Sequence, residues 1–510
     1  MSGANLAGLL DGPARWGAER PAIVVGNEPV RTWSGFADAV ARRAAALRDR
    51  HGIAPGDAVA LFAANHPAYL EALFAIWHAG GVAVPISSRL HAKEAADIID
   101  RGHAKLCFAT ADVADDLLAQ VDDVPVLVFG EADDAALLRA ESMAPVTRLA
   151  GDDAWIFFTS GTTGRAKGAR LSHHNLFAMS AAYTADAATV EPHDAIIHVA
   201  ALSHASGLMC LPFVARGGPQ VLPPSGGFDA AELLDLVAAG ERSSFFVPPT
   251  LLRRLAAHPA ARELDRERLG TILVGAAPVL PSDLRDGVDA FGPCLWNGYG
   301  QGESPCTITA NGKAAIGAAV VAGDEDALRS VGVARVGMRV RVVDGDDREL
   351  RPGEVGEVVA DGPTVMAGYL DLPEATAEAL RGGWLHTGDV GSFDEHGRLT
   401  LVDRAKDVVI TGGYNVYPRE VEDVLHADPA VAEAAVVGLP DAEWGERVVA
   451  FVVPVSGAEV DEQELDRRCL EAIARHKRPK EYRIVEELPR NAAGKILKKQ
   501  LRETAGVPHA

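Results

Sequence analysis

A loop rich in glycine, hydroxyl residues and one lysine follows an apolar strand pattern in the first third of the chain. The strand pattern is Trp155–Phe158, and residues 159–168 contain three glycines, four hydroxyl residues and Lys167. Glycine lets backbone N–H groups approach an oxyanion, hydroxyls donate further hydrogen bonds, and lysine neutralises charge. The segment therefore predicts a cradle for a polyphosphate, although a Gly/Ser/Thr cluster by itself is also typical of a surface turn.

Two common nucleotide-binding fingerprints do not fit the chain. The loop is not a Walker A motif, because Gly168 rather than Ser or Thr follows Lys167. The alternating glycines at residues 298–302 resemble a dinucleotide fingerprint, but Glu303 occupies the position of its last glycine. The phosphate chemistry of this sequence therefore needs a different explanation.

The elements that must position these residues have the pattern of an α/β protein. Short β-branched runs alternate with helical patterns at residues 36–47 and 69–77, which is typical of βαβ units with a mostly parallel sheet and covering helices. The expected strands are residues 58–62, 82–86, 195–201, 243–248 and 271–275.

The chain changes character in its last third. Residues 330–403 are rich in valine and turn signals, which predicts a β-rich distal part with antiparallel pairing, and a compact α/β segment follows. We expect a large N-terminal α/β domain over residues 1–402 and a small, mobile C-terminal α/β domain over residues 403–510. The elements expected in the small domain are helices at 420–426 and from Asp461, and strands at 434–437 and 448–455.

Composition narrows the possible functions. With 510 residues the chain has room for two to four domains, and 49 Lys and Arg against 71 Asp and Glu give a net charge of −22. A chain this acidic is a poor candidate for wrapping nucleic acid or for lying on an anionic membrane. The longest apolar region, residues 72–86, is too short to span a bilayer, which takes about 20 residues.

The cysteines and the N-terminus indicate a reducing compartment. None of the five cysteines has C-x-x-C spacing, which argues against a disulfide framework and a structural zinc site. The first residues lack the charged and long apolar parts of an export signal, so we expect a cytoplasmic enzyme. The cysteines are Cys107, Cys210, Cys294, Cys306 and Cys469.

Six segments closely resemble, in chain order, the signature motifs of the acyl-adenylate-forming enzymes, which include acyl-CoA synthetases, luciferases and adenylation domains. Six ordered motifs that extend over essentially the whole chain are far more specific than any one motif. The resemblance implies an AMP-binding N-terminal domain, a mobile C-terminal domain, and the use of ATP, Mg²⁺ and coenzyme A. The segments are Thr159–Gly168, Gly275–Pro278, Asn297–Glu303, Trp384–Asp389, Asp403–Pro418 and Pro489–Lys495.

The resemblance assigns ATP-binding positions residue by residue. Two of them also have a physical interpretation: Tyr299 offers a flat face for adenine, and Asp389 can accept hydrogen bonds from ribose hydroxyls. A core aromatic and an Asx turn are the open alternatives. The ATP positions are Thr159, Ser160, Gly161, Thr162, Thr163, Gly164, Lys167, Gly275, Ala276, Ala277, Pro278, Asn297, Gly298, Tyr299, Gly300, Gln301, Asp389 and Arg404.

Glu303 and Thr159 are the metal ligands that the resemblance implies. Glu303 supplies the hard oxygen that Mg²⁺ prefers, and a solvated carboxylate is the alternative. The chain departs from the family pattern nearby. Ala166 replaces a proline before the loop lysine, which leaves the loop less rigid, and Gly302 replaces the Thr or Ser that precedes the family's glutamate.

The resemblance also implies the reaction. Attack of a carboxylate on the α-phosphate of Mg·ATP gives an acyl-AMP and pyrophosphate, and the charge that builds up needs cations. Lys167 and Lys495 would supply that charge, while Lys406 occupies the position that turns the small domain for the second step. His204 matches a position beside the carboxylate pocket, although a satisfied loop histidine is an equally good interpretation.

Coenzyme A is the expected acyl acceptor. A basic cluster at residues 475–480 stands out in the acidic chain and suits a 3′-phosphate, and a solvated helix end is the alternative. Transfer to a carrier-protein thiol, and a non-catalytic nucleotide-binding protein on the same fold, are the alternative functions. The CoA positions are Gly412, Gly413, Trp444, Arg475 and Lys477.

The acid itself is predicted from the absence of basic residues. Segments that resemble the pocket walls, at residues 206–211, 247–250 and 298–308, contain no Arg or Lys to pair with a second carboxylate. We therefore predict an apolar monocarboxylate, which means a fatty, alicyclic or aromatic acid.

Overall fold

The computed structural model describes residues 4–159, 166–404, 407–411, 414–441, 444–490 and 496–505. The chain forms two compact units, Met1–Val340 with Ala360–His386, and Arg341–Val359 with Thr387–Ala510. The second unit includes residues 341–359 and 387–402, which the predicted boundary places in the N-terminal domain. The domain boundary at residue 403 stays a prediction.

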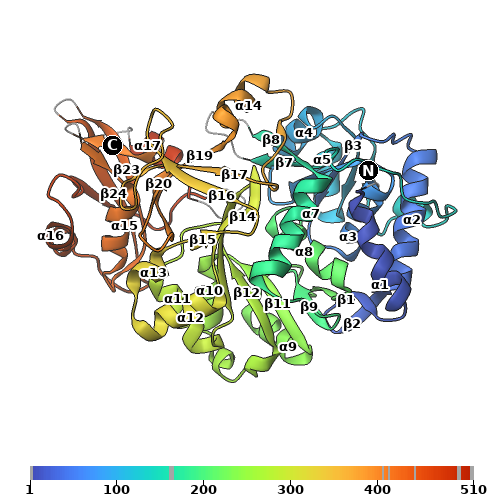
Figure 1. Cartoon of the computed structure of the whole chain (residues 1–510), viewed down its shortest axis with the longest axis horizontal. Coiled ribbons are helices and arrows are strands. Elements are labelled where there is room, and N and C mark those ends of the chain that lie inside the picture. The colour runs from blue at the N-terminus through green and yellow to red at the C-terminus, as the bar shows by residue number, and fades with distance from the viewer. Residues whose placement is uncertain are drawn as a thin grey trace. The chain divides into compact units, whose positions relative to one another are not determined.

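Two sheets form the frame of the first unit (Figure 1). Within the described residues, the larger has the order β15-β14-β13-β12-β11-β9-β10-β1-β2, and the smaller has the order β18-β8-β7-β4-β3-β5-β6. Inner strands pair in parallel, and antiparallel strands close both edges of the larger sheet and the β18 edge of the smaller one, whose other edge strand, β6, pairs in parallel.

The strands of the larger sheet are β1 (Pro21–Val25), β2 (Glu28–Thr32), β9 (Asp194–Ile197), β10 (Gln220–Leu222), β11 (Arg242–Val247), β12 (Leu269–Val274), β13 (Leu295–Gln301), β14 (Ser304–Asn311) and β15 (Val333–Ala334). Those of the smaller sheet are β3 (Ala58–Ala63), β4 (Val82–Ser87), β5 (Ala104–Ala109), β6 (Val126–Val128), β7 (Asp153–Thr159), β8 (Lys167–Ser172) and β18 (Gly368–Tyr369).

Helices fill the space between the two sheets and cover their outer faces. Helix α3 contacts β1 of the larger sheet and β3 and β4 of the smaller one, and α7 contacts β14 and β7 in the same way. Buried side chains from both sheets and from these helices form one hydrophobic core. Two further cores lie under the outer helices, α9 to α13 on the larger sheet and α4 and α5 on the smaller. This layered α/β architecture confirms the predicted fold class.

The helices of the first unit are α1 (Asp11–Trp16), α2 (Trp33–Asp49), α3 (Pro67–His78), α4 (Ala92–Arg101), α5 (Ala111–Leu118), α6 (Ala132–Leu137), α7 (His173–Ala182), α8 (Ala205–Arg216), α9 (Ala230–Ala239), α10 (Pro249–Ala256), α11 (Pro281–Phe291), α12 (Lys313–Ala322), α13 (Glu325–Arg329) and α14 (Pro373–Ala379).

Local sequence explains why most of these elements form where they do. The α2 helix begins after Thr32, whose hydroxyl accepts a hydrogen bond from the Gly35 amide, and its apolar stripe is buried as predicted. Strand β9 is shorter than the expected 195–201, because the carbonyls of His198 and Ala200 accept hydrogen bonds from the Asn65 amide instead of from a neighbouring strand.

The second unit contains an antiparallel hairpin, β23 (Val431–Asp441) and β24 (Gly445–Pro454), with β21 (Val409–Thr411), β22 (Tyr414–Val416) and β25 (Glu481–Ile484) in the same sheet. Alternate side chains of the hairpin enter two cores. One core includes α15 (Pro418–His426) and α16 (Glu462–Ala472), and the other includes α17 (Lys498–Ala505). A four-stranded sheet has the order β16 (Arg339–Val343), β17 (Gly356–Asp361), β19 (Leu385–Phe393), β20 (Leu399–Arg404).

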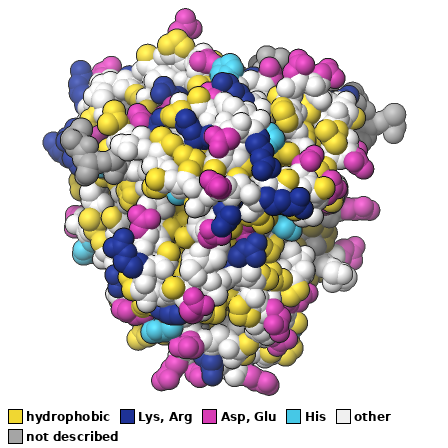
Figure 2. Space-filling model, turned by 90° about the vertical axis from the view of Figure 1, so that its right-hand side faces the viewer, with side chains coloured by type: hydrophobic (Ala, Val, Ile, Leu, Met, Phe, Trp, Pro, Cys, Tyr) yellow, Lys and Arg dark blue, Asp and Glu magenta, His cyan; other side chains and the backbone are white. Residues whose placement is uncertain are grey.

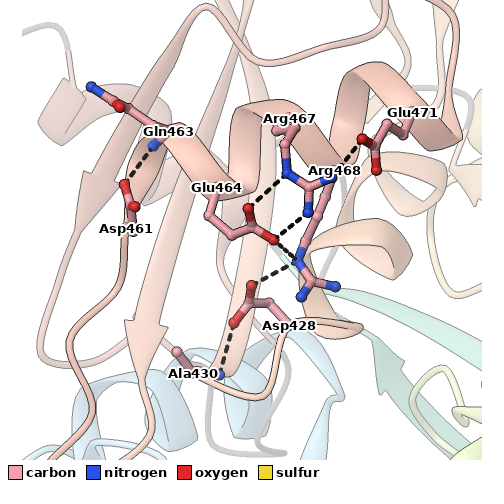
Figure 3. A network of polar contacts seen from close by, with 8 residues as sticks. All are labelled: Asp428, Ala430, Asp461, Gln463, Glu464, Arg467, Arg468 and Glu471. Atoms are coloured by element: carbon pink, nitrogen blue, oxygen red, sulfur yellow. Dashed lines mark hydrogen bonds and ion pairs between the residues drawn. The ribbon is translucent and has the colours of Figure 1, made fainter.

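An ion-pair network fastens α16 to the turn before β23 (Figure 3). The helix begins after Asp461, whose carboxylate accepts a hydrogen bond from the Gln463 amide. The side chain of Glu464 pairs with Arg468 at 3.0 Å, and Arg468 also contacts Asp428 at 2.9 Å. The predicted start of this helix at Asp461 is confirmed.

Acidic and basic side chains are interspersed on the face of the molecule drawn in Figure 2, with hydrophobic side chains scattered between them. The five cysteines are free thiols in the structure. Among the described residues, the structure contains no helix that is both long and apolar enough to cross a membrane.

Candidate functional site

Two antiparallel strands flank the predicted phosphate loop. Thr159 ends β7, Lys167 begins β8, and the two residues are paired partners in the sheet. Ser160, Gly161, Thr162, Thr163 and Gly164, which connect them, lie outside the described residues.

Ala166 is the first described residue after the loop, and it stands where the family pattern has proline. The Arg101 guanidinium, at the end of α4, donates a hydrogen bond of 2.5 Å to the Ala166 carbonyl and lies 5.8 Å from the Phe158 ring centroid. This contact anchors the Ala166 carbonyl, at the end of the loop, to a side chain of another element.

The predicted metal ligands lie together in the first unit. The Thr159 hydroxyl donates to Glu303 Oε1 at 3.2 Å, although the two residues are 144 positions apart. Glu303 is 9% exposed and sits in the turn that joins β13 and β14, where Gln301 pairs with Ser304. The sheets therefore bring the phosphate loop and the expected magnesium carboxylate to one place.

Sequence reasoning missed Tyr369, which contacts the same carboxylate. Its phenol donates to Glu303 Oε1 at 2.8 Å, and the Lys167 ammonium lies 5.0 Å from the centroid of its ring. Burial, together with the Glu303 charge, raises the pKa of Tyr369 above its ordinary value, so the phenol stays protonated and donates. No local signal marks this residue, because its partner is 66 positions away.

Because Gly302 has no side chain, the Thr159 side chain can pack directly against its backbone. A Cβ atom at residue 302 would lie 2.2 Å from the Thr159 methyl carbon and 2.9 Å from the Phe157 ring. Both distances are far inside van der Waals contact, so the departure from the family's Thr or Ser has a steric reason in this chain. The Thr159 hydroxyl, not one at residue 302, contacts Glu303.

The Glu303 carboxylate and the Thr159 hydroxyl provide oxygen atoms of the kind that Mg²⁺ prefers as ligands. Mg²⁺ is commonly held by one or two carboxylates together with substrate phosphates, so a complete protein cage is not required. Among the described residues there is no cluster of three or more His, Cys, Asp or Glu that could hold a metal ion.

The two segments predicted for the adenine side are neighbours. Gly275–Pro278 follows β12, and Asn297–Gln301 forms β13, which pairs with β12 in parallel. A Cβ atom at Gly275 would lie 2.8 Å from the Gly298 carbonyl oxygen, and Ala276 has a left-handed φ of 66°. Tyr299 is 8% exposed, so base stacking by this ring stays a prediction.

His204 lies beside the phosphate-loop strand. It precedes the first residue of α8, and its ring meets the edge of the Phe157 ring at 5.5 Å between centroids. Burial lowers the pKa of His204, and the Arg89 charge lowers it further, so the imidazole is neutral at neutral pH. Ser203 Oγ lies 2.9 Å from its Nδ1.

A buried histidine supports the turn that carries His204. His198 Nδ1 lies 2.8 Å from the Ser206 hydroxyl, and its Nε2 lies 3.1 Å from Gln220 Oε1. Since the Gln220 amide donates to the Gly218 carbonyl, its Oε1 accepts from the imidazole. The sequence offered no signal for this network apart from a polar residue in an apolar strand.

The ribose-motif residue lies in the second unit. Asp389, on β19, is 6% exposed and is the strand partner of Arg404 on β20. The Asp389 amide donates a hydrogen bond of 3.1 Å to the Thr387 hydroxyl oxygen, and the Gly388 amide donates to Glu357 Oε1. The side chain of Arg404 lies outside the described residues, and its role in ATP binding stays a prediction.

The predicted CoA residues that the structure describes differ in their surroundings. Trp444 is 44% exposed and the Lys480 ammonium lies 5.7 Å from its ring centroid, whereas Lys477 makes two 2.7 Å contacts with the Glu420 carboxylate. Arg475 is exposed. Gly412 and Gly413 lie outside the described residues, as do the catalytic candidates Lys406 and Lys495.

Family models match both parts of the chain. The model described as AMP-binding enzyme matches residues 11–370, and the model described as AMP-binding enzyme C-terminal domain matches residues 420–495. Together they include the predicted phosphate loop, the adenine-side segments, Glu303 and Tyr369.

Similar proteins include a feruloyl-CoA synthase of Amycolatopsis sp, 38% identical over 479 residues that cover 93% of this chain and 94% of that protein. The long-chain-fatty-acid–CoA ligase FadD13 of Mycobacterium tuberculosis is 34% identical over 516 residues, 99% of each chain. The crystal structure of ATP-bound MatB from Rhodopseudomonas palustris has a TM-score of 0.88 at 31% identity and covers 98% of this chain and 99% of that one.

Proposed function

The chain belongs to the AMP-binding enzyme family, and from this premise we propose that it activates an apolar monocarboxylic acid with ATP and transfers the acyl group to coenzyme A. The products are an acyl-CoA thioester, AMP and pyrophosphate. The observation that carries the proposal is the convergence of Thr159, Lys167 and Glu303, because this set combines a phosphate loop with a cation and an oxygen ligand for magnesium.

The chemistry of the first step matches that arrangement. A carboxylate is a poor electrophile until it has a leaving group, and attack on the α-phosphate of ATP provides AMP as that group. Negative charge builds on the transferring phosphoryl group, and Lys167 lies where the phosphate loop rejoins the sheet. Magnesium, held by Glu303 and Thr159, would neutralise part of the phosphate charge.

Two further lysines complete the proposal, and both assignments rest on the family resemblance. Lys495 contributes a cation at the α-phosphate and the attacking carboxylate during adenylation. Lys406 serves the thioester step after the small domain has turned. Mutation to alanine separates these roles: Lys495→Ala loses acyl-AMP formation and keeps thioester formation from supplied acyl-AMP, and Lys406→Ala shows the weaker, opposite bias.

The class of acid is supported by relatives that span aromatic and fatty acids. The names of the two similar ligases specify a feruloyl group and long-chain fatty acids. His204, held neutral beside Phe157, suits a hydrogen bond to the carboxylate of the acid without adding a second cation. A cytoplasmic location, for which the free cysteines are suitable, is part of the same proposal.

The test is pyrophosphate release over a panel of acids, with free CoA, with a phosphopantetheine-bearing carrier protein, and with neither. The proposal predicts turnover with an apolar monocarboxylate and CoA, and formation of the matching thioester. Preference for a short dicarboxylate would contradict the class of acid. Turnover with the carrier protein alone would contradict CoA as the acceptor.

A further inference from the structure

Tyr369 is held in place by backbone contacts on both sides. Its strand, β18, pairs with β8, where Tyr369 lies opposite Ala169, and the Leu370 amide donates to the Gly168 carbonyl at 2.8 Å. On the other side, the Met366 amide donates to the Glu303 carbonyl at 2.8 Å. The backbone position of Tyr369 is therefore determined by the sheet and not by the contact of its hydroxyl.

The Tyr369 hydroxyl contacts Glu303, whose side chain comes from the turn between β13 and β14. It donates to Glu303 Oε1 at 2.8 Å, and the Thr159 hydroxyl donates to the same oxygen at 3.2 Å. Neither bond uses Oε2. Two donors from two different elements thus restrict the rotation of one buried carboxylate, and the shorter bond is that of Tyr369.

Carboxylates that bind metal ions need such partners. A hydrogen bond to one oxygen orients the carboxylate, and the loss of such a partner typically costs about 10- to 100-fold in metal affinity or activity. Thr159 is itself an expected ligand and cannot serve only as a support. Tyr369 has no other role in the proposed reaction, and its phenol is the second donor.

We propose that Tyr369 is a positioning residue, whose phenol orients the Glu303 carboxylate for the magnesium ion of Mg·ATP. This inference rests on the proposed function, in which Glu303 is a metal ligand. If Tyr369 served only for packing, loss of its hydroxyl would lower the stability of the fold and would leave the dependence of ATP binding on Mg²⁺ unchanged. A positioning tyrosine changes that dependence and leaves the fold nearly unchanged.

The first experiment uses Tyr369→Phe in the full-length chain. Phenylalanine keeps the ring beside the Lys167 ammonium and removes only the hydroxyl. The affinity for ATP is measured by calorimetry with saturating Mg²⁺ and with EDTA, and the ratio of the two dissociation constants is the readout. We expect the advantage conferred by Mg²⁺ to fall roughly tenfold, while the affinity in EDTA and the melting temperature change little.

The matched control is Tyr69→Phe. Tyr69 lies in α3, is fully buried, and its hydroxyl has no hydrogen-bond partner among the described residues. This substitution removes the same group without touching Glu303, so the Mg²⁺ ratio should equal that of the unmodified chain. An equal fall in both variants would overturn the inference, because it would reflect a general effect of losing a buried hydroxyl.

A double-mutant cycle tests whether Tyr369 acts through Glu303. In a Glu303→Gln background, the additional Tyr369→Phe change should have no further effect on the Mg²⁺ ratio. A full effect in that background would overturn the inference. If Glu303→Gln alone leaves the ratio unchanged, the metal role of Glu303 and the inference both fail, whereas acyl-CoA formation by the unmodified chain still supports the proposed function.

Discussion

The cluster around Glu303 and the basic segment at residues 475–480 both stand out in the sequence as charged groups, yet they have opposite surroundings. Glu303 is buried and receives hydroxyl donors from residues 144 and 66 positions away. The basic segment is partly exposed, and one of its lysines is already paired with Glu420. A charge that is buried among distant partners has a restricted orientation, whereas a charge at the surface is screened by water and by whichever carboxylate is near.

The largest effect should follow the loss of the buried carboxylate. We expect Glu303→Gln to lower the rate of acyl-AMP formation by about 10²- to 10³-fold, because an oriented charge in a water-poor site is lost. The measurement is pyrophosphate release in single turnovers, with the melting temperature as the control for folding. A fall in rate of less than about threefold would contradict the contrast between the buried Glu303 and the exposed basic segment, because Glu303 would then behave like a surface charge.

Buried polar groups should also determine acid stability. Burial lowers the pKa of His198 to about 4 from its ordinary value of 6.5. As the pH falls, the unfolded chain therefore binds a proton at this histidine before the folded chain does. The free energy of unfolding that depends on His198 is fully present above about pH 6.5 and is lost as the pH falls toward 4. The total loss, reached below pH 4, is roughly 3 kcal/mol.

Urea unfolding of His198→Asn at pH 7.5 and pH 5 tests this expectation. The difference between the two midpoints should shrink in the variant, while exposed His396→Asn should keep the difference of the unmodified chain. His173, whose pKa burial also lowers to about 4, keeps part of the acid sensitivity in both variants. An unchanged difference in His198→Asn would contradict the assigned neutral state.

A side chain at residue 302 should disturb the Glu303 cluster sterically. We expect Gly302→Thr to lower acyl-AMP formation by roughly tenfold, because its Cβ would displace Thr159 and with it one donor to Glu303. Gly227→Thr is the matched control, since nothing lies within 4 Å of a Cβ atom there. If Gly302→Thr is as active as the control, the close packing of Thr159 does not matter for catalysis.

The smallest effects should come from the basic segment. Arg475→Ala should raise the KM for CoA by about two- to fivefold, and Lys477→Ala should raise it less, because Glu420 already neutralises that lysine. Repeating the assay with dephospho-CoA, which lacks the 3′-phosphate, should remove the Arg475 effect. A larger effect at Lys477 than at Arg475 would reverse the order that the structure predicts.

The local sequence pattern was sufficient to predict those helices and strands whose own residue types favour one secondary structure. The helix at Trp33–Asp49 follows from apolar residues at helical spacing and a threonine cap, and the buried runs of β3 and β4 follow from their length and flanking turns. Strand β13 was not predicted, because two glycines in Leu295–Gln301 and the following turn indicate a loop. Sheet pairing on both sides makes that segment extended despite its glycines.

The sequence by itself determined the family and the fold class, because these depend on residue types and order along the chain, and it predicts Glu303 as the metal carboxylate. Only the tertiary structure decided that Tyr369 and Thr159 share Glu303, that Gly302 makes room for Thr159, and that Lys477 is paired. Each of these contacts joins residues from separate elements. Their distances depend on how the sheets pair and pack, which no local spacing encodes.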